Sequence, residues 1–229
     1  MDIIVEDWGE IDYTAAFQRQ RSTVDAVIAG GCGHLIFCEH PSVVTLGRSF
    51  KEASLLYSKE EIEQNGVSVQ VIDRGGDVTL HAPGQLVVYV ILNLNLFDRH
   101  LKMYLENLEQ VAVDLLKEFG ILAVSIPGNR GVFVPTPLWE GEDQLNETSI
   151  GVDQQKIISI GIGVRKWVSY HGLGINVNTD ISLFSFIKPC GLNVHMTSMA
   201  KLLRHPVAME DVKRVWVKIF SKTFDVNIV

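Results

Sequence analysis

LVVYVILNL, residues 86–94, contains the longest unbroken apolar stretch of the chain. Its length and its β-branched residues are typical of a buried strand. Residues 100–119 follow with helical spacing, and one face of that helix carries Leu101, Leu105, Leu108, Val111, Ala112, Leu115 and Leu116. These two segments therefore predict a buried strand and then an amphipathic helix.

Outward from this pair, the period of the apolar residues keeps switching between strand and helix. Strands are predicted at residues 3–5, 34–39, 43–46, 67–71, 132–134, 157–164 and 170–177. Helices are predicted from Asp12 to Gly30-Gly31, from a Ser58 and Glu61 capping box to Asn65-Gly66, and over residues 210–224. Because turns connect the strands as often as helices do, the pattern favours an α/β (α+β) fold, a mixed β-sheet flanked by helices, over a doubly wound parallel sheet.

The length and composition predict one globular domain spanning residues 1–229. A chain of 229 residues that is 47% hydrophobic and 21% charged can bury one sizeable core. Its start carries Asp2, Glu6, Asp7 and Glu10, the reverse of the basic start of a signal or transit peptide. The apolar run at 86–92 is also far shorter than the roughly 20 residues that span a bilayer. We expect a soluble, cytoplasmic monomer that does not associate with membranes.

The three cysteines, Cys32, Cys38 and Cys190, are an odd number and show no metal-ligand spacing. This usage argues against a disulfide framework and for a reducing compartment. The histidines His34, His40, His81 and His171 form no ligand pattern with Cys190 either. The sequence therefore predicts no metal and no cofactor.

The net charge of −7 is unevenly distributed along the chain. Residues 1–155 hold 10 basic and 23 acidic side chains, whereas residues 156–229 hold 10 and 4. The basic half would attract acidic partners, and the acidic half disfavours nucleic-acid binding. Between the halves, residues 135–155 (PTPLWEGEDQLNETSIGVDQQ) are polar and turn-rich and predict a long surface loop.

Two reactive residues lie in the basic half. Cys190 occurs in the string KPCG, 34 positions after Lys156 in KIISIG. A free thiol has a pKa of about 8.5, and a lysine ammonium beside it would raise the fraction of thiolate. If the two side chains meet, they predict an acyltransferase.

A polar, glycine-rich string, RGGDVTLHAPGQ at residues 74–85, lies between two predicted strands. Its glycines allow the backbone to approach a ligand closely. Arg74, Thr79 and His81 could point into one pocket. The string therefore predicts a binding site.

With this string, the chain resembles the octanoyltransferases of lipoate biosynthesis, the lipoyl(octanoyl)-protein transferases. The resemblance also rests on EHPSVVTLGR (39–48), KIISIG (156–161), WVSYHGLGINVNTD (167–180), Pro189-Cys190-Gly191 and Thr197-Ser198-Met199. These strings occur in the order of the family and extend over most of the chain. The resemblance implies the catalytic-domain fold of biotin and lipoate protein ligases.

The resemblance also implies a reaction in two steps. Octanoyl passes from octanoyl-acyl carrier protein to the enzyme's cysteine as a thioester, and then to a lysine of a lipoyl domain. The acceptors would be the lipoyl domains of 2-oxoacid dehydrogenases and the glycine cleavage H protein. Such chemistry needs no metal or nucleotide, because a thioester donor is already activated.

Carried over by residue, Cys190 would be the nucleophile and Lys156 the group that lowers its pKa and later acts as a base. His81 and backbone N–H groups near Cys190 are candidates for polarising the thioester carbonyl. The substrate-binding residues implied by the resemblance are Arg74, Gly75, Gly76, Asp77, Val78, Thr79, Leu80, His81, Ser159, Ile160, Gly161, Gly172, Leu173 and Gly174. Glycines 161, 172 and 174 would leave room for the acyl chain.

Three features depart from the family. Ala82 replaces a glycine and would be strained if its φ were positive. Gly174 stands where alanine is more frequent and could widen the acyl slot. The 135–155 stretch is longer than the usual connection before the lysine and could affect partner docking.

Three other functions remain open on the sequence. An ATP-dependent lipoate ligase of the same fold would use Lys156 to bind an adenylate, but Cys190 argues against it. A cysteine hydrolase would use His81 or His171 as its base. A non-catalytic binding module would keep the pocket without turnover, against which the presence of both Lys156 and Cys190 argues.

Overall fold

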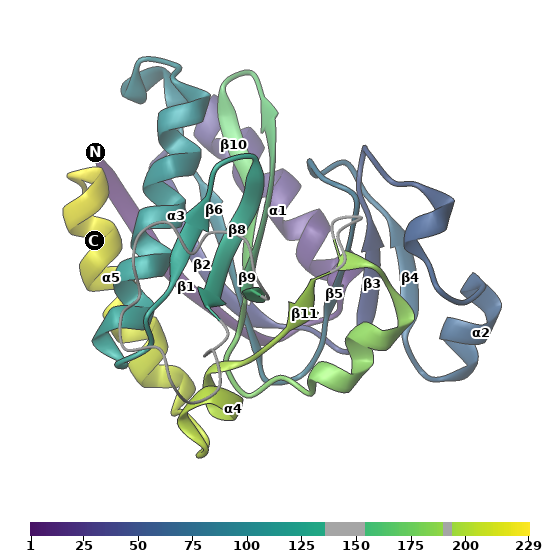
Figure 1. The fold of residues 1–229 in the computed structure, drawn as a ribbon. Coiled ribbons are helices and arrows are strands. Elements are labelled where there is room, and N and C mark those ends of the chain that lie inside the picture. The colour runs from purple at the N-terminus through teal and green to yellow at the C-terminus, as the bar shows by residue number, and fades with distance from the viewer. Residues whose placement is uncertain (136–153, 190–193) are drawn as a thin grey trace.

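The computed structural model describes residues 1–135, 154–189 and 194–229. Its centre is a nine-stranded sheet in the order β12-β1-β2-β6-β10-β9-β8-β7, with β11 paired to β9 (Figure 1). The strands are β1 (Asp2–Glu10), β2 (Gly33–Glu39), β6 (Gln85–Ile91), β7 (Val124–Ile126), β8 (Asn129–Pro135), β9 (Gln154–Arg165), β10 (Val168–Asn176), β11 (His195–Met196) and β12 (Asn227–Ile228).

The predicted mixed sheet is confirmed. Strand β1 runs parallel to β2 and to β12, and β11 runs parallel to β9. The pairs from β2 through β6, β10, β9 and β8 to β7 are antiparallel. Antiparallel neighbours need only turns between them, which is why the sequence shows so few helical crossovers.

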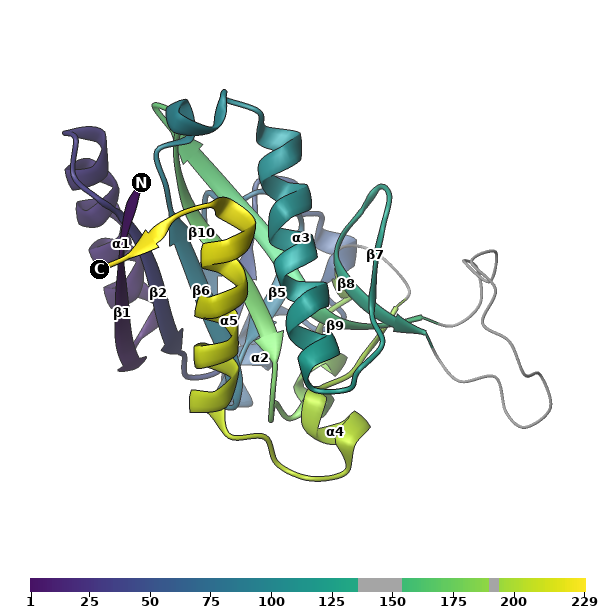
Figure 2. The same ribbon diagram turned by 90° about the vertical axis from the view of Figure 1, so that its left-hand side faces the viewer.

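Helices cover both faces of this sheet (Figure 2). Helix α3 (Leu101–Glu118) and helix α5 (Met209–Phe224) pack on one face, and α1 (Tyr13–Ile28) packs on the other. In β6, Leu86, Val88 and Val90 join the α3 and α5 core, while alternate residues such as Val87 join the α1 core. Strand β6 is thus buried on both faces, which accounts for its unbroken apolar sequence.

A second, three-stranded sheet lies beside the first (Figure 1). It consists of β4 (Ser68–Val71), β3 (Val43–Leu46) and β5 (Val78–His81), next to the short helix α2 (Lys59–Gln64). Its core contains Val44, Leu46, Ile62, Val78 and Leu80. The turn at residues 82–84 leads from β5 directly into β6, so it joins the small sheet to the large one.

That turn answers the question raised by Ala82. Ala82 is buried against the core of the small sheet and is not among the residues with positive φ. Gly84 instead has a φ of +82°, and a Cβ there would lie 2.7 Å from the carbonyl oxygen of Asn178. The alanine is therefore unstrained, and Gly84 is the position in the turn that requires glycine.

Both predicted helix caps are confirmed. Asp12 accepts a hydrogen bond from the backbone N–H of Ala15 at 3.0 Å. The side chain of Ser58 accepts from Glu61 N–H, while the Glu61 carboxylate accepts from Ser58 N–H, as a capping box does.

The structure corrects several predicted boundaries. Strand β1 continues to Glu10 rather than ending at residue 5; its outer half is polar because it is largely exposed. Leu94 begins a 3-10 turn, η2 (Leu94–Phe97), instead of ending a strand. Pro135 and Gln154 pair across β8 and β9, so the ends of the predicted 135–155 loop are strand; its remainder, residues 136–153, lies outside the described residues.

The remaining elements were not predicted. They are β5, β7, β11 and β12, the helix α4 (Met199–Leu203), and the 3-10 turns η1 (Glu52–Ser54), η2 and η3 (Ile181–Phe186). Each is six residues or shorter, and a run of this length carries little periodic signal of its own. Among the helices in the described ranges, none has the length and apolar character needed to cross a membrane.

Candidate active site

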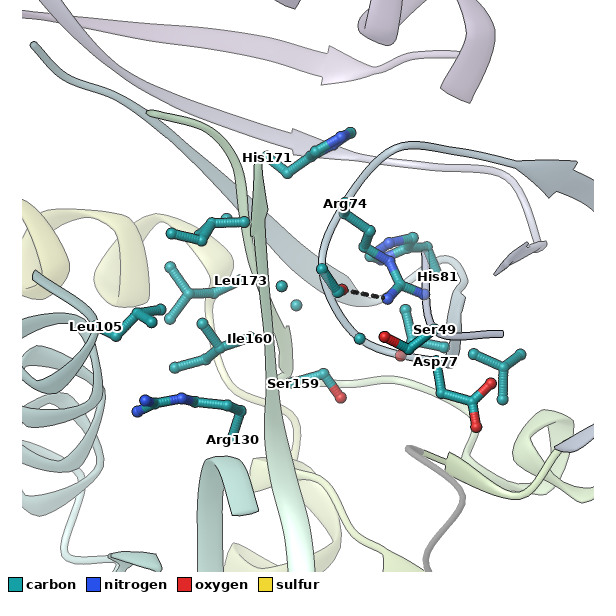
Figure 3. A pocket seen from close by; sticks show the side chains of 18 of the residues that line it. Ser49, Arg74, Asp77, His81, Leu105, Arg130, Ser159, Ile160, His171 and Leu173 are labelled. Atoms are coloured by element: carbon teal, nitrogen blue, oxygen red, sulfur yellow. Dashed lines mark hydrogen bonds between the residues drawn. The ribbon is translucent and has the colours of Figure 1, made fainter. Parts of the chain in front are cut away.

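A cavity of about 700 Å³ opens where the small sheet meets β9 and β10 (Figure 3). Thirteen of the fourteen predicted substrate-binding residues line it: Arg74, Gly75, Gly76, Asp77, Val78, Thr79, His81, Ser159, Ile160, Gly161, Gly172, Leu173 and Gly174. The exception is Leu80, which β5 turns into the core of the small sheet. Three separate parts of the sequence thus meet around one cavity.

Arg74 is held by the small sheet. Its Nη2 donates to the carbonyl oxygen of Thr45 at 2.7 Å and to Thr45 Oγ1 at 3.0 Å. Its Nη1 donates to the carbonyl oxygen of Gly75 at 2.9 Å. The loop itself is joined to β9 because Gly75 N–H donates to the carbonyl oxygen of Ile162 at 2.8 Å. These hydrogen bonds fix the position of the guanidinium in the wall of the cavity.

Asp77 holds the neighbouring 51–54 segment. Its carboxylate accepts from Ser54 Oγ at 2.5 Å and from Lys51 N–H at 3.1 Å. Asp77 is buried, so these hydrogen bonds replace the water that its carboxylate loses. Its contacts indicate that it shapes the wall of the cavity.

The glycines on β9 and β10 accommodate other parts of the protein. A Cβ on Gly161 would lie 3.0 Å from the carbonyl oxygen of Gly75. One on Gly172 would collide with the carbonyl oxygen of Val88, and one on Gly174 would lie 2.8 Å from Gln85 Oε1. The space beside each glycine is therefore taken first by neighbouring protein atoms, although all three line the cavity.

The cavity has an apolar side and a polar side. Figure 3 shows Leu105, Ile160 and Leu173 on one side of strands β9 and β10, with Arg130 at the end of this group, and Ser49, Asp77 and Arg74 on the other side. Leu101, at the start of α3, also lines the cavity and is 39% exposed. The sequence placed Leu101 and Leu105 on the face of α3 that packs in the core; the structure shows that this face extends beyond the core and lines the cavity.

His81 is a buried, neutral side chain in this cavity. Its Nδ1 lies 2.6 Å from Oε1 of Gln85. Burial, and next the nearby His40, lower the pKa of His81 to about 3. At neutral pH the imidazole therefore carries no charge.

Lys156 is completely buried on β9. Its Nζ donates to the carbonyl oxygen of Arg130 at 2.7 Å and lies 5.3 Å from the centre of the Phe133 ring. Arg130 lines the cavity, so the ammonium is held by a residue of the cavity wall. The backbone N–H of Thr197 donates to the carbonyl oxygen of Lys156 at 2.9 Å.

The Arg130 segment is anchored by a carboxylate on α3. Glu109 lies on the packed face of the helix and is only 6% exposed. Its carboxylate lies 3.4 Å from Arg130 Nη1 and accepts a hydrogen bond from Gly131 N–H at 3.3 Å. A Cβ on Gly131 would lie 2.7 Å from Cε of Lys156. The backbone at Gly131 thus packs too closely against Lys156 to leave room for a side chain.

Cys190 lies outside the described residues, so its predicted contact with Lys156 stays a prediction. Pro189 ends the described segment before it, and β11 follows with Met196 paired to Lys156.

Sequence reasoning missed several residues of the cavity wall. They are Tyr13, Ser49, Lys51, Val87, Tyr89, Leu101, Leu105, Gly128, Asn129, Arg130, Ile162 and His171. Of these, His171 had been considered only as the base of a hydrolase; the structure pairs its Nε2 with Asp73 Oδ1 at 3.0 Å. That hydrogen bond is the main cause that lowers the pKa of Asp73 to about 2. His171 also has a φ of 59°, a strained value for a non-glycine residue.

The fold and the cavity define a class of protein. Residues 12–221 match the family described as the lipoyl protein ligase A/B catalytic domain. A bipartite lipoate protein ligase from Thermoplasma acidophilum superposes with a TM-score of 0.72 at 17% identity, covering 100% of this chain and 86% of that one. Lipoate-protein ligase A bound with ATP gives 0.72 at 17%, covering 100% and 88%. These structures show a shared fold.

Sequence relatives define the family more closely. An octanoyltransferase of Bacteroides fragilis is 38% identical over 220 residues, which cover 93% of this chain and 94% of the relative. One of Caldicellulosiruptor saccharolyticus is 41% identical over 192 residues, covering 83% and 74%. The chain belongs to the octanoyltransferases, within the lipoyl protein ligase A/B catalytic-domain family.

Proposed function

We propose that this enzyme moves an octanoyl group from octanoyl-acyl carrier protein, through a thioester on Cys190, to a lysine of a lipoyl domain. The observation that carries the proposal is the fully buried Lys156, whose ammonium is held by the wall of a cavity with an apolar side. The octanoyltransferase relatives, which match nearly the whole chain, support the acyl group.

In the first step, the thiolate of Cys190 attacks the thioester carbonyl of the donor. A new C–S bond forms to Cys190, the C–S bond to the donor's pantetheine breaks, and Lys156 gives its proton to the leaving thiolate. In the second step, the lysine amine of the acceptor attacks the Cys190 thioester, and neutral Lys156 accepts the proton that the amine loses. An amide forms, the C–S bond breaks, and the Cys190 thiolate returns.

The apolar side of the cavity is suited to the eight-carbon chain. Leu105, Ile160 and Leu173 offer aliphatic surface there. At about 0.8 kcal/mol for each buried methylene, burial of the chain contributes on the order of 5 kcal/mol to binding. We expect the polar residues between Arg74 and His81 to contact the thioester and the pantetheine arm of the donor.

We expect acidic partners to dock on the basic part of the chain. Lys166, Lys188, Lys201 and Arg204 are exposed; Arg165, in contrast, is paired with Asp25. The acceptors in this proposal are lipoyl domains of 2-oxoacid dehydrogenases and the glycine cleavage H protein. Cys32 and Cys38 are free thiols, which fits a cytoplasmic location.

An acylation experiment tests the proposal. The protein is incubated with octanoyl-acyl carrier protein alone, and its intact mass is measured before and after hydroxylamine treatment. We expect one octanoyl mass, removed by hydroxylamine and absent in Cys190→Ala. Transfer that requires ATP would instead identify a ligase, and release of free octanoate without an acceptor would identify a hydrolase. A protein that binds the donor but forms no adduct would be a binding module.

A further inference from the structure

The carboxamide of Gln85 is fixed in one orientation by the protein around it. Its Nε2 donates to the carbonyl oxygen of Leu80 at 3.1 Å and to Oδ1 of Asn176 at 2.9 Å. A backbone carbonyl can only accept, so the amide nitrogen must lie on that side and Oε1 on the other. Asn176 is fixed in turn, because its Nδ2 donates to the carbonyl oxygen of Thr197 at 3.0 Å.

The orientation of Gln85 decides which ring nitrogen of His81 carries the hydrogen. Oε1 of Gln85, which can only accept, lies 2.6 Å from Nδ1 of His81, so Nδ1 is the donor. Because burial lowers the pKa of His81 to about 3, the ring carries one proton at neutral pH. Nε2 is therefore left as an acceptor, and no described residue forms a hydrogen bond with it.

Aromatic neighbours hold the plane of the His81 ring. The Tyr13 ring stacks on it with centroids 5.8 Å apart and an interplanar angle of 16°. The His40 ring packs edge-on at 5.7 Å. His40 has no hydrogen to offer His81, since its Nδ1 donates to the carbonyl oxygen of Ile11 and its Nε2 accepts from the hydroxyl of Tyr89.

We infer that Gln85, supported by Asn176, is a positioning residue that keeps His81 protonated on Nδ1, so that Nε2 accepts a hydrogen bond from an N–H group of the substrate. This role of His81 differs from the expectation that it polarises the thioester carbonyl, because an oxyanion needs a donor and an unprotonated Nε2 has no hydrogen to donate. Two substrate groups offer such an N–H: an amide of the pantetheine arm and the amine of the acceptor lysine.

Gly174 is part of this arrangement. A Cβ at this position would lie 2.8 Å from Oε1 and 3.1 Å from Cδ of Gln85. Only glycine therefore leaves enough space for the Gln85 carboxamide in its observed position. Glycine in place of alanine at this position therefore makes room for the side chain of Gln85.

Ring nitrogen NMR tests the inference directly. In protein labelled with ¹⁵N, two-bond correlations from the ring C–H protons distinguish a protonated from an unprotonated nitrogen, and His81→Leu assigns the signals. We expect His81 to be protonated on Nδ1, to shift toward the Nε2-protonated form in Gln85→Leu, and to stay Nδ1-protonated in Gln85→Glu. Nε2 protonation in the unaltered protein, or an unchanged spectrum in Gln85→Leu, would overturn it.

A matched pair of asparagines supplies the control. Asn176→Ala should disturb the His81 signals because it removes the support of Gln85. The side chain of Asn178 makes two hydrogen bonds with the backbone of Val207 and none with Gln85. Asn178→Ala should leave the His81 signals as they are, and an equal disturbance by both variants would count against the inference.

Kinetics of the separate steps identifies the N–H group, and this arm rests on the proposed function. In His81→Leu, we expect about a three- to tenfold loss in one step. If the pantetheine amide is the donor, acylation by octanoyl-acyl carrier protein slows while acylation by an amide-free octanoyl alkyl thioester does not. If the lysine amine is the donor, only transfer to a lipoyl domain slows. Equal losses in every step, or none, would contradict the inference.

The two proposals fail separately. Absence of a Cys190 adduct would refute octanoyl transfer and leave the NMR result intact. A wrong tautomer would refute the role of Gln85 and leave the adduct intact.

Discussion

The ammonium of Lys156 lies 2.7 Å from the carbonyl oxygen of Arg130, and the same Arg130 pairs through its guanidinium with Glu109 on α3. The buried amino group of Lys156 thus contacts the backbone of a residue whose side chain pairs with a buried carboxylate on α3. Because unpaired buried charges are costly, each member of this chain of contacts stabilises the next.

The first prediction concerns Lys156. Without the ammonium, the thiol of Cys190 should return toward its ordinary pKa of about 8.5, so less thiolate is present at neutral pH. We expect Lys156→Ala to slow alkylation of Cys190 by iodoacetamide about tenfold at pH 7 and to approach the unaltered protein as pH rises. Rates are read by peptide mass spectrometry, which separates Cys190 from Cys32 and Cys38. Superimposable pH profiles would remove Lys156 from this role.

The second prediction concerns Glu109. Glu109→Gln keeps an oxygen that can accept from Gly131 N–H but removes the charge that pairs with Arg130. We expect a loss of about 1–3 kcal/mol in the free energy of unfolding, with a slower acylation step. Glu106→Gln is the matched control, because Glu106 lies on the same helix in an exposed pair with Lys102. Equal stability of the two variants, measured by urea denaturation, would show that Glu109 does not anchor the segment.

The third prediction concerns the support of Arg74. Thr45→Val removes the hydroxyl that accepts from the guanidinium but keeps the shape of the side chain. We expect KM for octanoyl-acyl carrier protein to rise several-fold with a smaller change in kcat, since binding rather than chemistry is affected. Thr45→Ser retains the hydroxyl and should restore KM; a serine variant as impaired as the valine variant would refute this explanation.

The fourth prediction concerns the apolar side of the cavity. Leu105→Phe adds volume next to Ile160 and Leu173 and should shorten the accepted acyl chain. In competition between hexanoyl and octanoyl donors, read by the mass of the enzyme adduct, the ratio should move toward hexanoyl by about tenfold. Met103→Phe changes a partly exposed residue of the same helix outside the cavity and should leave the ratio unchanged.

The fifth prediction is a pH dependence of stability. The pKa of His81 is about 3 in the folded protein and 6.5 when the chain is unfolded, so between these values only the unfolded chain binds the proton. The free energy of unfolding should therefore fall as pH decreases from about 6.5 toward 3, by up to about 1.4 kcal/mol per pH unit from this group. His40 adds in the same direction, because burial lowers its pKa.

His81→Gln tests this assignment. The slope of its unfolding free energy against pH should be smaller between pH 4 and 6, by about the contribution of one bound proton. Identical slopes in His81→Gln and the unaltered protein would show that another group dominates the acid sensitivity.

The strongly periodic parts of the fold could be predicted from the sequence. The apolar run at 86–94 predicts β6, because a strand buried on both faces is apolar along its length. The helical spacing that follows predicts α3, because one buried stripe of a helix repeats over many residues. Strand β5 could not be recognised, because its residues lie within a polar, glycine-rich string. Strands β7 and β12 are too short to carry a period.

The residues of the site also divide into those that the sequence predicted and those that it could not. The string at residues 74–85 identified one wall of the cavity through its glycines and polar side chains. Glu109 and Arg130 are 21 positions apart and belong to no local motif, so only the packing of α3 against β8 brings them together. Leu101 and Leu105 continue the apolar face of α3, and nothing in the sequence marks where the core ends and the cavity begins.

The pairing of β1 with β12 has a consequence for the order of folding. Asp2 pairs with Asn227 and Ile3 with Ile228, so one edge of the sheet joins residues from opposite ends of the chain (Figure 2). Contacts so distant in sequence form late and slow the folding of a domain. During synthesis, β1 cannot close this edge until residues 227 and 228 have been made, and until then the open edge of β1 would be a place where chaperones or other growing chains bind.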